Sequence, residues 1–161
     1  MTAVAHEAEI VYRGAGPGGE QLVTVECGGQ PLGPLGPLRH VLRHSHAGHS
    51  WGYPEPGPSD LARRLIIAAL GDQAHCATCA GTGRIAIRCD ETDAERVDPY
   101  EPSEHDGGDW QVAHCWDCEG GFARLPYQRF TSDVVAGLPR TGWVLTRSSI
   151  LDWLRTERDR P

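Results

Sequence analysis

The chain has 161 residues, enough for one ordinary domain with its own hydrophobic core, and it is rich in Gly (20) and Pro (12). These two residue types favour loops and short elements over long helices or a large sheet. The formal net charge is −7 and all 15 basic residues are Arg. A net negative charge of this size argues against non-specific binding to a nucleic-acid phosphate backbone.

The first ten residues, MTAVAHEAEI, lack the basic start and the apolar stretch of a signal peptide. The longest apolar run, residues 65–70, is too short to span a bilayer. We therefore expect a cytoplasmic protein that makes no use of a membrane. Because thiols stay reduced in that compartment, paired cysteines indicate a metal site more often than a disulfide.

Two segments near the start of the chain, residues 8–14 and 21–27, alternate in the manner of half-buried strands. A glycine-rich link, residues 14–19, joins them and predicts a hairpin. This link lacks the Lys-Ser/Thr pair of a phosphate loop, so we interpret it as a turn. The PLGPLGPLRH stretch that follows, residues 31–40, is interrupted by Pro and cannot begin as regular helix.

A first helix is predicted from Ser59, a suitable N-cap, to Leu70. Gly71 then occupies the position where a glycine commonly ends a helix. Leu61 and Leu65 share one face with Ala68 and Ala69, so this helix is expected to pack inward.

The end of the chain predicts a helix, a strand and a further helix. The first of these helices covers residues 126–138, with Pro126 in its first turn. Residues 143–145 have the pattern of a short strand. Thr146 or Ser148 is then placed to cap a last helix that carries Ile150, Leu151 and Leu154.

The middle of the chain differs from both ends because it is strongly acidic. Residues 75–121 contain eleven Asp and Glu against three Arg, a net −8, whereas the remainder is close to neutral. Residues 90–108 have little to bury, which predicts a mobile loop. We therefore expect a single α+β domain over residues 1–161, with a small antiparallel sheet, about three helices and an inserted zinc-knuckle β-hairpin at residues 74–122.

One internal repeat lies in this segment: AHCATCAG at residues 74–81 recurs as AHCWDCEG at residues 113–120. Two C-x-x-C pairs supply the four thiolates that a closed tetrahedral zinc site needs. Gly81 and Gly120 follow where the chain must turn back with a positive φ. The predicted ligands of one structural zinc ion are Cys76, Cys79, Cys115 and Cys118.

The sequence between the two pairs supports a single site. Residues 84–88 alternate as a strand that leaves the first pair, and residues 110–113 can return to the second. Antiparallel pairing of these strands would bring the cysteines together, and loop closure costs little extra for a long connection. Disulfides or a redox C-x-x-C are the alternatives.

Two histidines that adjoin the pairs and two cysteines that have no C-x-x-C partner lie outside that set. His75 and His114 directly precede cysteines and either could replace one as a ligand, although such a neighbour is more often not a ligand. Cys27 is expected to be a strand residue and Cys89 a bystander at a strand end.

Two other features of the sequence invite a functional interpretation. The histidines His40, His44, His46 and His49 could bind a second metal or have an acid–base role, but we favour exposed or hydrogen-bonded loop residues. Trp51 and Tyr53 could form a docking surface, and we favour aromatic anchors of a loop. No Ser is framed as a nucleophile elbow and no H-E-x-x-H is present, so no catalytic residue is predicted.

The first cysteine pair, CATCAGTG at residues 76–83, is similar to the C-x-x-C-x-G-x-G repeats of the J-domain co-chaperone cysteine-rich domain. The second pair, CWDCEGGF, departs from this pattern because Phe122 occupies the place of the last Gly. There are two copies here and not four, and no J-domain sequence. The resemblance implies the geometry of a knuckle and does not imply chaperone activity.

A second resemblance covers more of the chain. The segment HSWGYPEPGPSDLARRLIIAAL, residues 49–70, resembles the signature of the domain-of-unknown-function family 6166, and residues 127–154 resemble its closing helix, strand and helix. Pro54 and Glu55 replace the glycines usual in the family. The family is small, prokaryotic and phage-associated, without established activity, so the resemblance implies a compact α+β scaffold only. The shared positions are Trp51, Gly52, Tyr53, Gly57, Pro58, Leu61, Ala62, Phe130, Val134, Val135 and Trp143.

These observations favour a non-enzymatic, zinc-stabilised interaction or accessory protein of a bacterial, plasmid or phage genome, with a protein partner. The alternative is a nucleic-acid-binding zinc-knuckle regulator that uses the C-terminal cluster Arg147, Arg155, Arg158 and Arg160. The net −8 around the cysteines argues against that alternative. An enzyme ranks third because four cysteines leave no open position on the metal.

Overall fold

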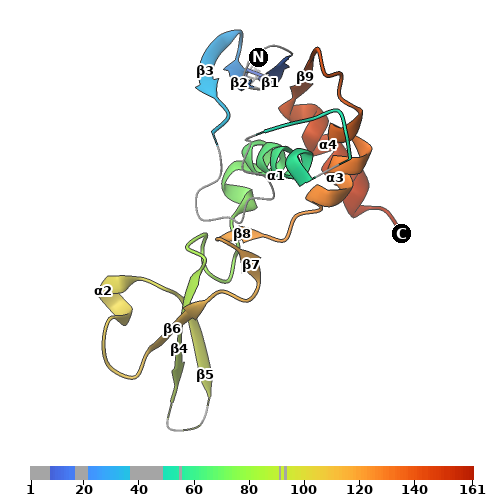
Figure 1. The fold of residues 1–161 in the computed structure, drawn as a ribbon. Helices are drawn as coiled ribbons and strands as arrows, with labels where there is room; N and C mark the ends of the chain where they lie inside the picture. The colour runs from blue at the N-terminus through green and yellow to red at the C-terminus, as the bar shows by residue number, and fades with distance from the viewer. Residues whose placement is uncertain (1–7, 17–21, 37–48, 55, 91, 93) are drawn as a thin grey trace, which may run out of the picture. The chain divides into compact units, whose positions relative to one another are not determined.

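The computed structural model describes residues 8–16, 22–36, 49–54, 56–90, 92 and 94–161. The chain divides into two compact units (Figure 1). The terminal unit is formed by residues 1–70 together with 126–161, and the cysteine unit by residues 71–125. Helices and antiparallel sheets make up both, which confirms the predicted α+β class.

The terminal unit contains a four-stranded antiparallel sheet with the strand order β3-β2-β1-β9. Strands β1 and β2 form the predicted hairpin, in which Tyr12 lies opposite Val25. Strand β9 pairs with the other edge of β1 and places Trp143 opposite Gly14. The strands are β1 (Ile10–Ala15), β2 (Leu22–Cys27), β3 (Gln30–Pro34) and β9 (Gly142–Thr146).

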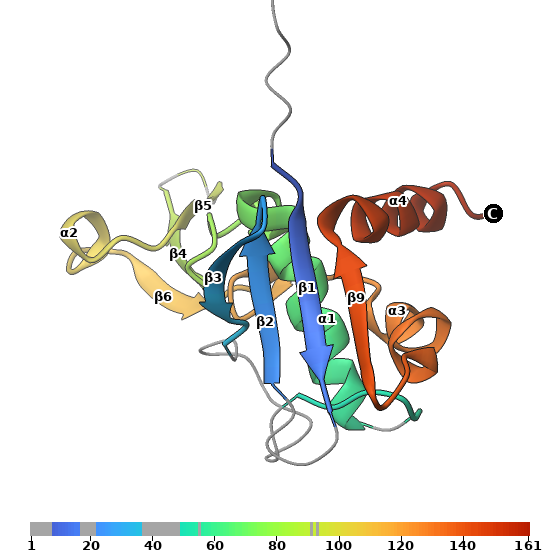
Figure 2. The ribbon, with the colours of Figure 1, turned by 90° about the horizontal axis from the view of Figure 1, so that it is seen from above.

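Three helices of the terminal unit lie on one side of this sheet: α1 (Pro56–Leu70), α3 (Tyr127–Asp133) and α4 (Arg147–Arg158) (Figure 2). Alternate strand residues point toward them, because side chains along a strand alternate between the two faces of the sheet. Tyr12, Val23 and Trp143 are buried on that face, whereas Val144 on the opposite face is exposed. The core therefore lies between the sheet and α1.

Helix α1 begins three residues earlier than predicted, at Pro56, so Ser59 lies inside the helix and is not its N-cap. Proline is well suited to a first helical turn because its φ is already helical and its missing N–H has no partner there. At the other end Gly71 has φ +59°, which confirms it as the residue that ends the helix.

Helix α3 is shorter than the predicted helix at residues 126–138. It begins after Pro126 and ends at Asp133, and Val134 has φ −127°, outside the helical range. A 3-10 turn, η2 (Val135–Gly137), follows and directs Val135 into the core. Consecutive β-branched valines are poor helix formers, so tertiary packing decides their conformation.

The predicted strand at residues 143–145 is confirmed as part of β9, and Thr146 rather than Ser148 caps α4. The Thr146 hydroxyl accepts a hydrogen bond from the Ser149 N–H, and the Ser149 hydroxyl accepts one from the Thr146 N–H. This reciprocal capping box satisfies two backbone donors at the start of the helix.

The cysteine unit contains a three-stranded antiparallel sheet of order β5-β4-β6 and the two-stranded pair β7-β8. Ile85 of β4 lies opposite Ala113 of β6, which confirms the predicted return strand. The elements are η1 (Gly71–Ala74), β4 (Arg84–Cys89), β5 (Glu95–Pro99), α2 (Pro102–His105), β6 (Gln111–His114), β7 (Cys118–Glu119) and β8 (Phe122–Ala123).

Residues 90–108, expected as a mobile loop, contain strand β5 and helix α2. The ring of His105 is buried and packs edge-on against Trp110, with ring centroids 4.6 Å apart. Its Nδ1 also accepts a hydrogen bond from the backbone N–H of Glu101 at 3.0 Å. This small aromatic cluster organises a segment whose composition alone indicates no core.

Candidate metal centre

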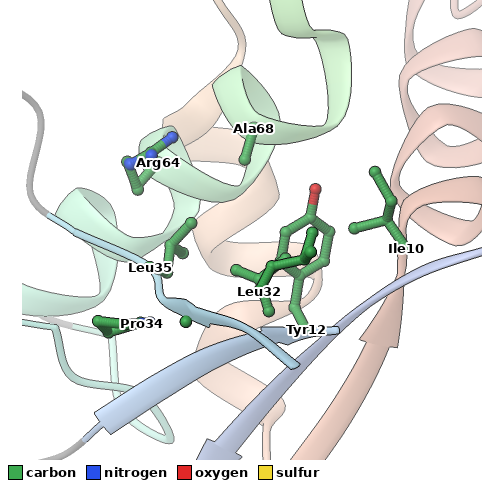
Figure 3. Close-up of a pocket in the computed structure, with 9 residues that line it drawn as sticks. Ile10, Tyr12, Leu32, Pro34, Leu35, Arg64 and Ala68 are labelled. Atoms are coloured by element: carbon green, nitrogen blue, oxygen red, sulfur yellow. The ribbon is translucent and has the colours of Figure 1, made fainter. Parts of the chain in front are cut away.

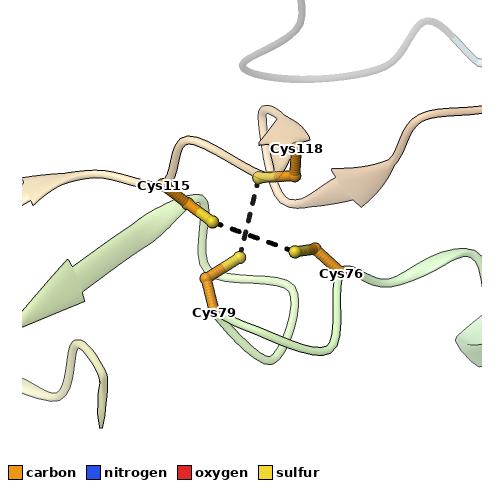
Figure 4. Close-up of side chains that lie close together, drawn as sticks. All are labelled: Cys76, Cys79, Cys115 and Cys118. Carbon is orange, nitrogen blue, oxygen red and sulfur yellow. Dashed lines mark hydrogen bonds between the residues drawn. The ribbon is translucent and has the colours of Figure 1, made fainter. Parts of the chain in front are cut away.

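The two C-x-x-C pairs meet in the cysteine unit, and their four sulfur atoms all lie within 4.8 Å of one another (Figure 4). The Cys76 Sγ is 3.8 Å from the Cys115 Sγ, and the Cys79 Sγ is 3.7 Å from the Cys118 Sγ. All four cysteines are free thiols, and these separations are far longer than the S–S bond of about 2.05 Å in a disulfide. The residues that the sequence analysis selected therefore form one group.

The spacing of these sulfurs fits a metal ion. Four thiolates bonded to a central ion at about 2.3 Å occupy the corners of a tetrahedron with an edge of about 3.8 Å. Two cross-pair distances, 3.7 and 3.8 Å, match that edge. The four cysteines could thus hold a metal ion, in the manner of a pair of zinc knuckles.

Each C-x-x-C pair is fixed by the backbone of the other. The Cys76 N–H donates to the Gly121 C=O at 2.8 Å, and the Cys115 N–H donates to the Gly83 C=O at 2.9 Å. The first cysteine of each pair thus bonds to the glycine turn that follows the other pair. This reciprocal exchange holds the sulfurs near one another through main-chain hydrogen bonds.

The sequence analysis identified Gly81 and Gly120 as turn residues but did not select Gly83 and Gly121, which make the exchange. All four have positive φ, +83°, +61°, +73° and +93° for residues 81, 120, 83 and 121. A Cβ on Gly121 would lie 2.1 Å from the Gly81 carbonyl oxygen. The signal available in the sequence is the second glycine after each C-x-x-C.

Backbone N–H groups point at the sulfur atoms, as expected for thiolates in a metal site. The Gly83 N–H donates to the Cys79 Sγ at 3.2 Å. Burial raises the pKa of the Cys76 thiol, but hydrogen bonds from the Cys79 and Thr78 N–H groups and with the Cys115 and Cys79 side chains together leave that pKa lowered. Cys76 accordingly favours the thiolate.

In the second C-x-x-C pair the pKa values of the thiols are raised, not lowered. Burial raises the pKa of Cys118 to about 12, and it also raises the pKa of Cys115. Without a cation the four thiols cannot all ionise, because each thiolate disfavours the next. A metal ion that binds here must therefore displace protons from the second pair.

Neither His75 nor His114 belongs to the group of close ligand atoms found within the described ranges. The His75 ring packs against Phe122 with centroids 5.7 Å apart, and the two residues also form a β-bridge. Phe122, which departs from the co-chaperone pattern, thus contacts the histidine beside the first knuckle, which remains exposed. His114 is an exposed residue of β6.

The apolar core around the cysteines is small. It consists of Cys76, Cys79, Cys115 and Ile85, with Ile87, Val97, Ala113 and Cys118 partly buried against it. Trp116, in the middle of the second C-x-x-C, is 50% exposed. The cysteine side chains are thus the main interior of this unit, and an aromatic side chain remains on its surface.

Several other predicted residues have structural roles. Cys27 ends β2, and its thiol lies 3.6 Å from the Ala8 C=O, whereas Cys89 is exposed at the end of β4. His49 Nε2 is 3.1 Å from the Leu35 C=O. The remaining histidines of that stretch, His40, His44 and His46, lie outside the described residues.

Trp51 anchors its loop from within, as favoured by the sequence analysis. The side chain is 0% exposed, its Nε1 donates to the Pro139 C=O at 3.1 Å, and its ring meets Trp143 edge-on. The Tyr53 hydroxyl donates to Ser50. The Trp-Gly-Tyr segment is therefore a packing feature of the terminal unit, not a free aromatic surface.

The C-terminal arginines, considered above as nucleic-acid contacts, have partners within the terminal unit. Their pairing with carboxylates or carbonyls reduces the positive charge that a phosphate backbone would meet. The pairs are Arg147 with the Ala69 C=O, Arg155 with Asp152, Arg158 with Asp159, and Arg160 with Asp133 and Glu157.

Residues 12–80 match the family of unknown function (DUF6166). The match contains the Trp-Gly-Tyr segment, all of α1 and the first cysteine pair, which confirms the resemblance based on residues 49–70. No curated protein and no solved structure matches the chain. Within the described part of the chain no helix has the length and apolar character needed to cross a membrane.

Proposed function

We propose that the four cysteines hold one zinc ion, and that the chain is a non-enzymatic, cytoplasmic accessory protein whose cysteine unit binds another protein. The observation that carries this proposal is the close grouping of the four sulfur atoms, two of whose separations fit the tetrahedral edge for Zn–S bonds of about 2.3 Å. Zinc prefers four thiolates in this geometry, as in other knuckle-type sites. A bacterial, plasmid or phage genome is the expected source.

A structural role suits this ion better than a catalytic role. Catalytic zinc sites keep one position open for water or substrate, and four cysteine ligands leave no such position. Three of the four cysteines are buried, so the ion would be shielded by protein. The ion then stabilises the fold of the cysteine unit, and the chemistry of the protein is recognition.

The surface of the cysteine unit favours a cationic protein segment as the partner. Residues 75–121 have a net charge of −8, and Trp116 adds an exposed aromatic ring. Arginines within that stretch are engaged with the unit itself: Arg84 lies over the Tyr100 ring, and Arg88 and Arg96 lie over Trp110. A partner would therefore meet a surface on which acidic side chains outnumber basic ones and which includes one exposed indole.

The first test is the metal content of the protein with a matched pair of substitutions. We expect about one zinc per chain in protein purified without chelator. Cys115→Ser should lose the metal and melt the cysteine unit, whereas Cys89→Ser, at an exposed cysteine outside the group, should retain both. Wild-type protein without metal and with four freely titratable thiols would refute the zinc site.

The second test identifies the partner class by pull-down from the native host, with and without nuclease. We expect protein partners that survive nuclease and are lost with Cys115→Ser but kept with Cys89→Ser. Capture that depends on nucleic acid and falls steeply with added salt would instead support the nucleic-acid-binding alternative. Partner binding that survives loss of the zinc would count against the interaction role of the cysteine unit.

A further inference from the structure

A second candidate site lies entirely within the terminal unit and includes none of the four cysteines of the candidate metal centre. It is a cavity of about 310 Å³ between strands β1 and β3 and helix α1 (Figure 3). This volume is at the lower end of the range for pockets that bind small molecules. Its walls present both polar and apolar surface, and the apolar side chains among them are Ile10, Val25, Leu32, Leu35 and Ala68.

Tyr12 supplies a polar group to this cavity. The residue is only 1% exposed, and its side chain rises from β1 toward Ala68 of α1, so that its hydroxyl stands among the lining side chains (Figure 3). No hydrogen bond joins this hydroxyl to another described residue. Its oxygen is not one of the fully buried polar atoms without a partner, so it opens on the cavity and is available to a ligand there.

Arg64 supplies a positive charge to the same cavity from α1. Its Nε donates to the Gly36 C=O at 2.7 Å, and no carboxylate of the described residues forms an ion pair with the guanidinium. Burial lowers the pKa of Arg64, as expected for a cation that has lost water. The terminal nitrogens thus remain available to an anion.

The electrostatic setting of Tyr12 agrees with an anion site. Burial raises the pKa of Tyr12, and the positive charges of Arg147 and Arg64 oppose that rise more strongly than Glu9 adds to it. The hydroxyl therefore stays protonated as a donor while two cations act on the space near it. A ligand that offers an acceptor with one negative charge would satisfy both Tyr12 and Arg64.

We propose that this cavity binds a small carboxylate with an apolar body, whose carboxylate accepts hydrogen bonds from Arg64 and the Tyr12 hydroxyl. Its aliphatic or aromatic part contacts Leu32, Leu35 and Ile10. One guanidinium and one phenol match a single carboxylate, whereas a phosphate dianion needs more donors than these walls provide. This site is independent of the zinc proposal because no cysteine contributes to it.

The test uses the full-length protein with octanoate as the probe and 1-octanol as a neutral molecule of the same chain length. Methyl signals of Ile10, Leu32 and Leu35 are followed by NMR during titration. We expect octanoate to shift all three and to bind at least about tenfold more tightly than 1-octanol, since the charge-assisted contact is lost with the alcohol.

Two substitutions separate the polar contacts. Arg64→Met should weaken octanoate binding by about tenfold or more and remove its advantage over 1-octanol, and Tyr12→Phe should weaken octanoate by about threefold to tenfold. Arg155→Met, at an exposed arginine of α4, is the matched control and should leave binding unchanged. Dispersion of the amide spectrum checks that each variant is folded.

The wild-type titrations alone can refute the proposal. Equal shifts with octanoate and 1-octanol would mean an apolar void without anion recognition. No shift of the three methyl groups up to about 10 mM octanoate, a concentration that detects even millimolar binding, would mean that the cavity is not a carboxylate site. Folded Arg64→Met protein that binds octanoate as tightly as the wild type would overturn the role of the cation.

Discussion

Trp51 illustrates how a conspicuous surface motif can be a core residue. Its indole is buried against Trp143 with ring centroids 5.6 Å apart, and Gly14 lies so close that an added Cβ would meet the Trp143 ring at 2.2 Å. Gly52, next in the chain, has φ +80°. The Trp-Gly pair therefore links the family segment to β1 and β9, and its residue types follow from packing and backbone conformation.

His49 is held in the neutral form by its surroundings. Burial is the main cause that lowers its pKa from the ordinary value of 6.5. Its Nε2 lies 3.1 Å from the Leu35 carbonyl and so carries the proton, while Nδ1 is buried without a partner within the described part of the chain. Protonation of Nδ1 would add a buried N–H with no acceptor.

This arrangement predicts a pH dependence of stability. Because the folded pKa lies below the unfolded value, the unfolded chain binds the proton more readily. The contribution of neutral His49 is thus complete above about pH 7 and declines as the pH falls through 6.5 toward the lower folded pKa. We expect the wild type to lose more unfolding free energy than His49→Gln between pH 7.5 and 5.5.

Urea denaturation of both proteins at the two pH values measures this difference, in which the acid response of the cysteines cancels. An NMR titration of His49 in the wild type provides the direct control. A pH response that is the same in the wild type and in His49→Gln would show that His49 has no part in it.

At the level of elements, the two glycine turns after the C-x-x-C pairs form the least replaceable contact of the cysteine unit. Gly121 approaches the Gly81 carbonyl, and Gly83 approaches the Gly121 nitrogen, so backbone meets backbone without side chains between. The exchanged hydrogen bonds of Cys76 and Cys115 need this close approach. The turns thus act as one element although residues 81 and 121 are far apart in sequence.

Gly121→Ala should therefore disrupt the cysteine unit. The new Cβ would lie 2.1 Å from the Gly81 carbonyl oxygen and would have to adopt φ +93°. The combined clash and strain should cost at least about 3 kcal/mol and weaken metal binding markedly. Competition with a chromogenic zinc chelator measures that loss.

Gly107→Ala is the matched control for this substitution. Gly107 also has a positive φ, +117°, but a Cβ there would meet nothing within 4 Å. Its cost should be limited to backbone strain of about 1–3 kcal/mol, with zinc affinity retained. If both variants bind zinc like the wild type, the close contact between the glycine turns is not required for the site.

Elements with a simple local pattern could be predicted from the sequence. The β1–β2 hairpin, the return strand β6 and the last helix follow alternation, pairing and capping rules at their own residues. Strand β3 was missed because Pro31 and Pro34 interrupt it, which only an edge strand tolerates. Strand β5 and helix α2 were missed because their burial depends on contacts between side chains far apart in sequence.

The cysteine group was predictable for a chemical reason, because a C-x-x-C repeat indicates both the type of metal ligand and the turn between the two ligands. The second candidate site was not predictable. Tyr12 and Arg64 come from a strand and a helix, and each has an ordinary periodic position in its own element. Only the packing of β1, β3 and α1 reveals that a donor and a cation face one cavity.

At the scale of the whole molecule, the two units have different sources of stability. The terminal unit buries large side chains between a sheet and helices, among them Trp51, Phe130 and Ile150. The cysteine unit buries chiefly three cysteines and Ile85 around its site. A unit of this size with so little apolar interior normally needs a metal or disulfides to fold.

Metal removal should consequently unfold one unit and spare the other. Chelation of zinc from the full-length protein should collapse the amide dispersion of residues 71–125, because metal binding and folding of such a site are coupled. Residues of α1, α3 and α4 should keep their signals, since their core contains no cysteine ligand. Added Zn²⁺ should restore the lost signals and added Mg²⁺ should not, because a hard cation that prefers oxygen does not replace zinc among four thiolates.

Persistence of the amide dispersion of residues 71–125 after complete chelation would show that the cysteine unit folds without metal. Loss of both sets of signals together would show that the two units unfold as one cooperative structure.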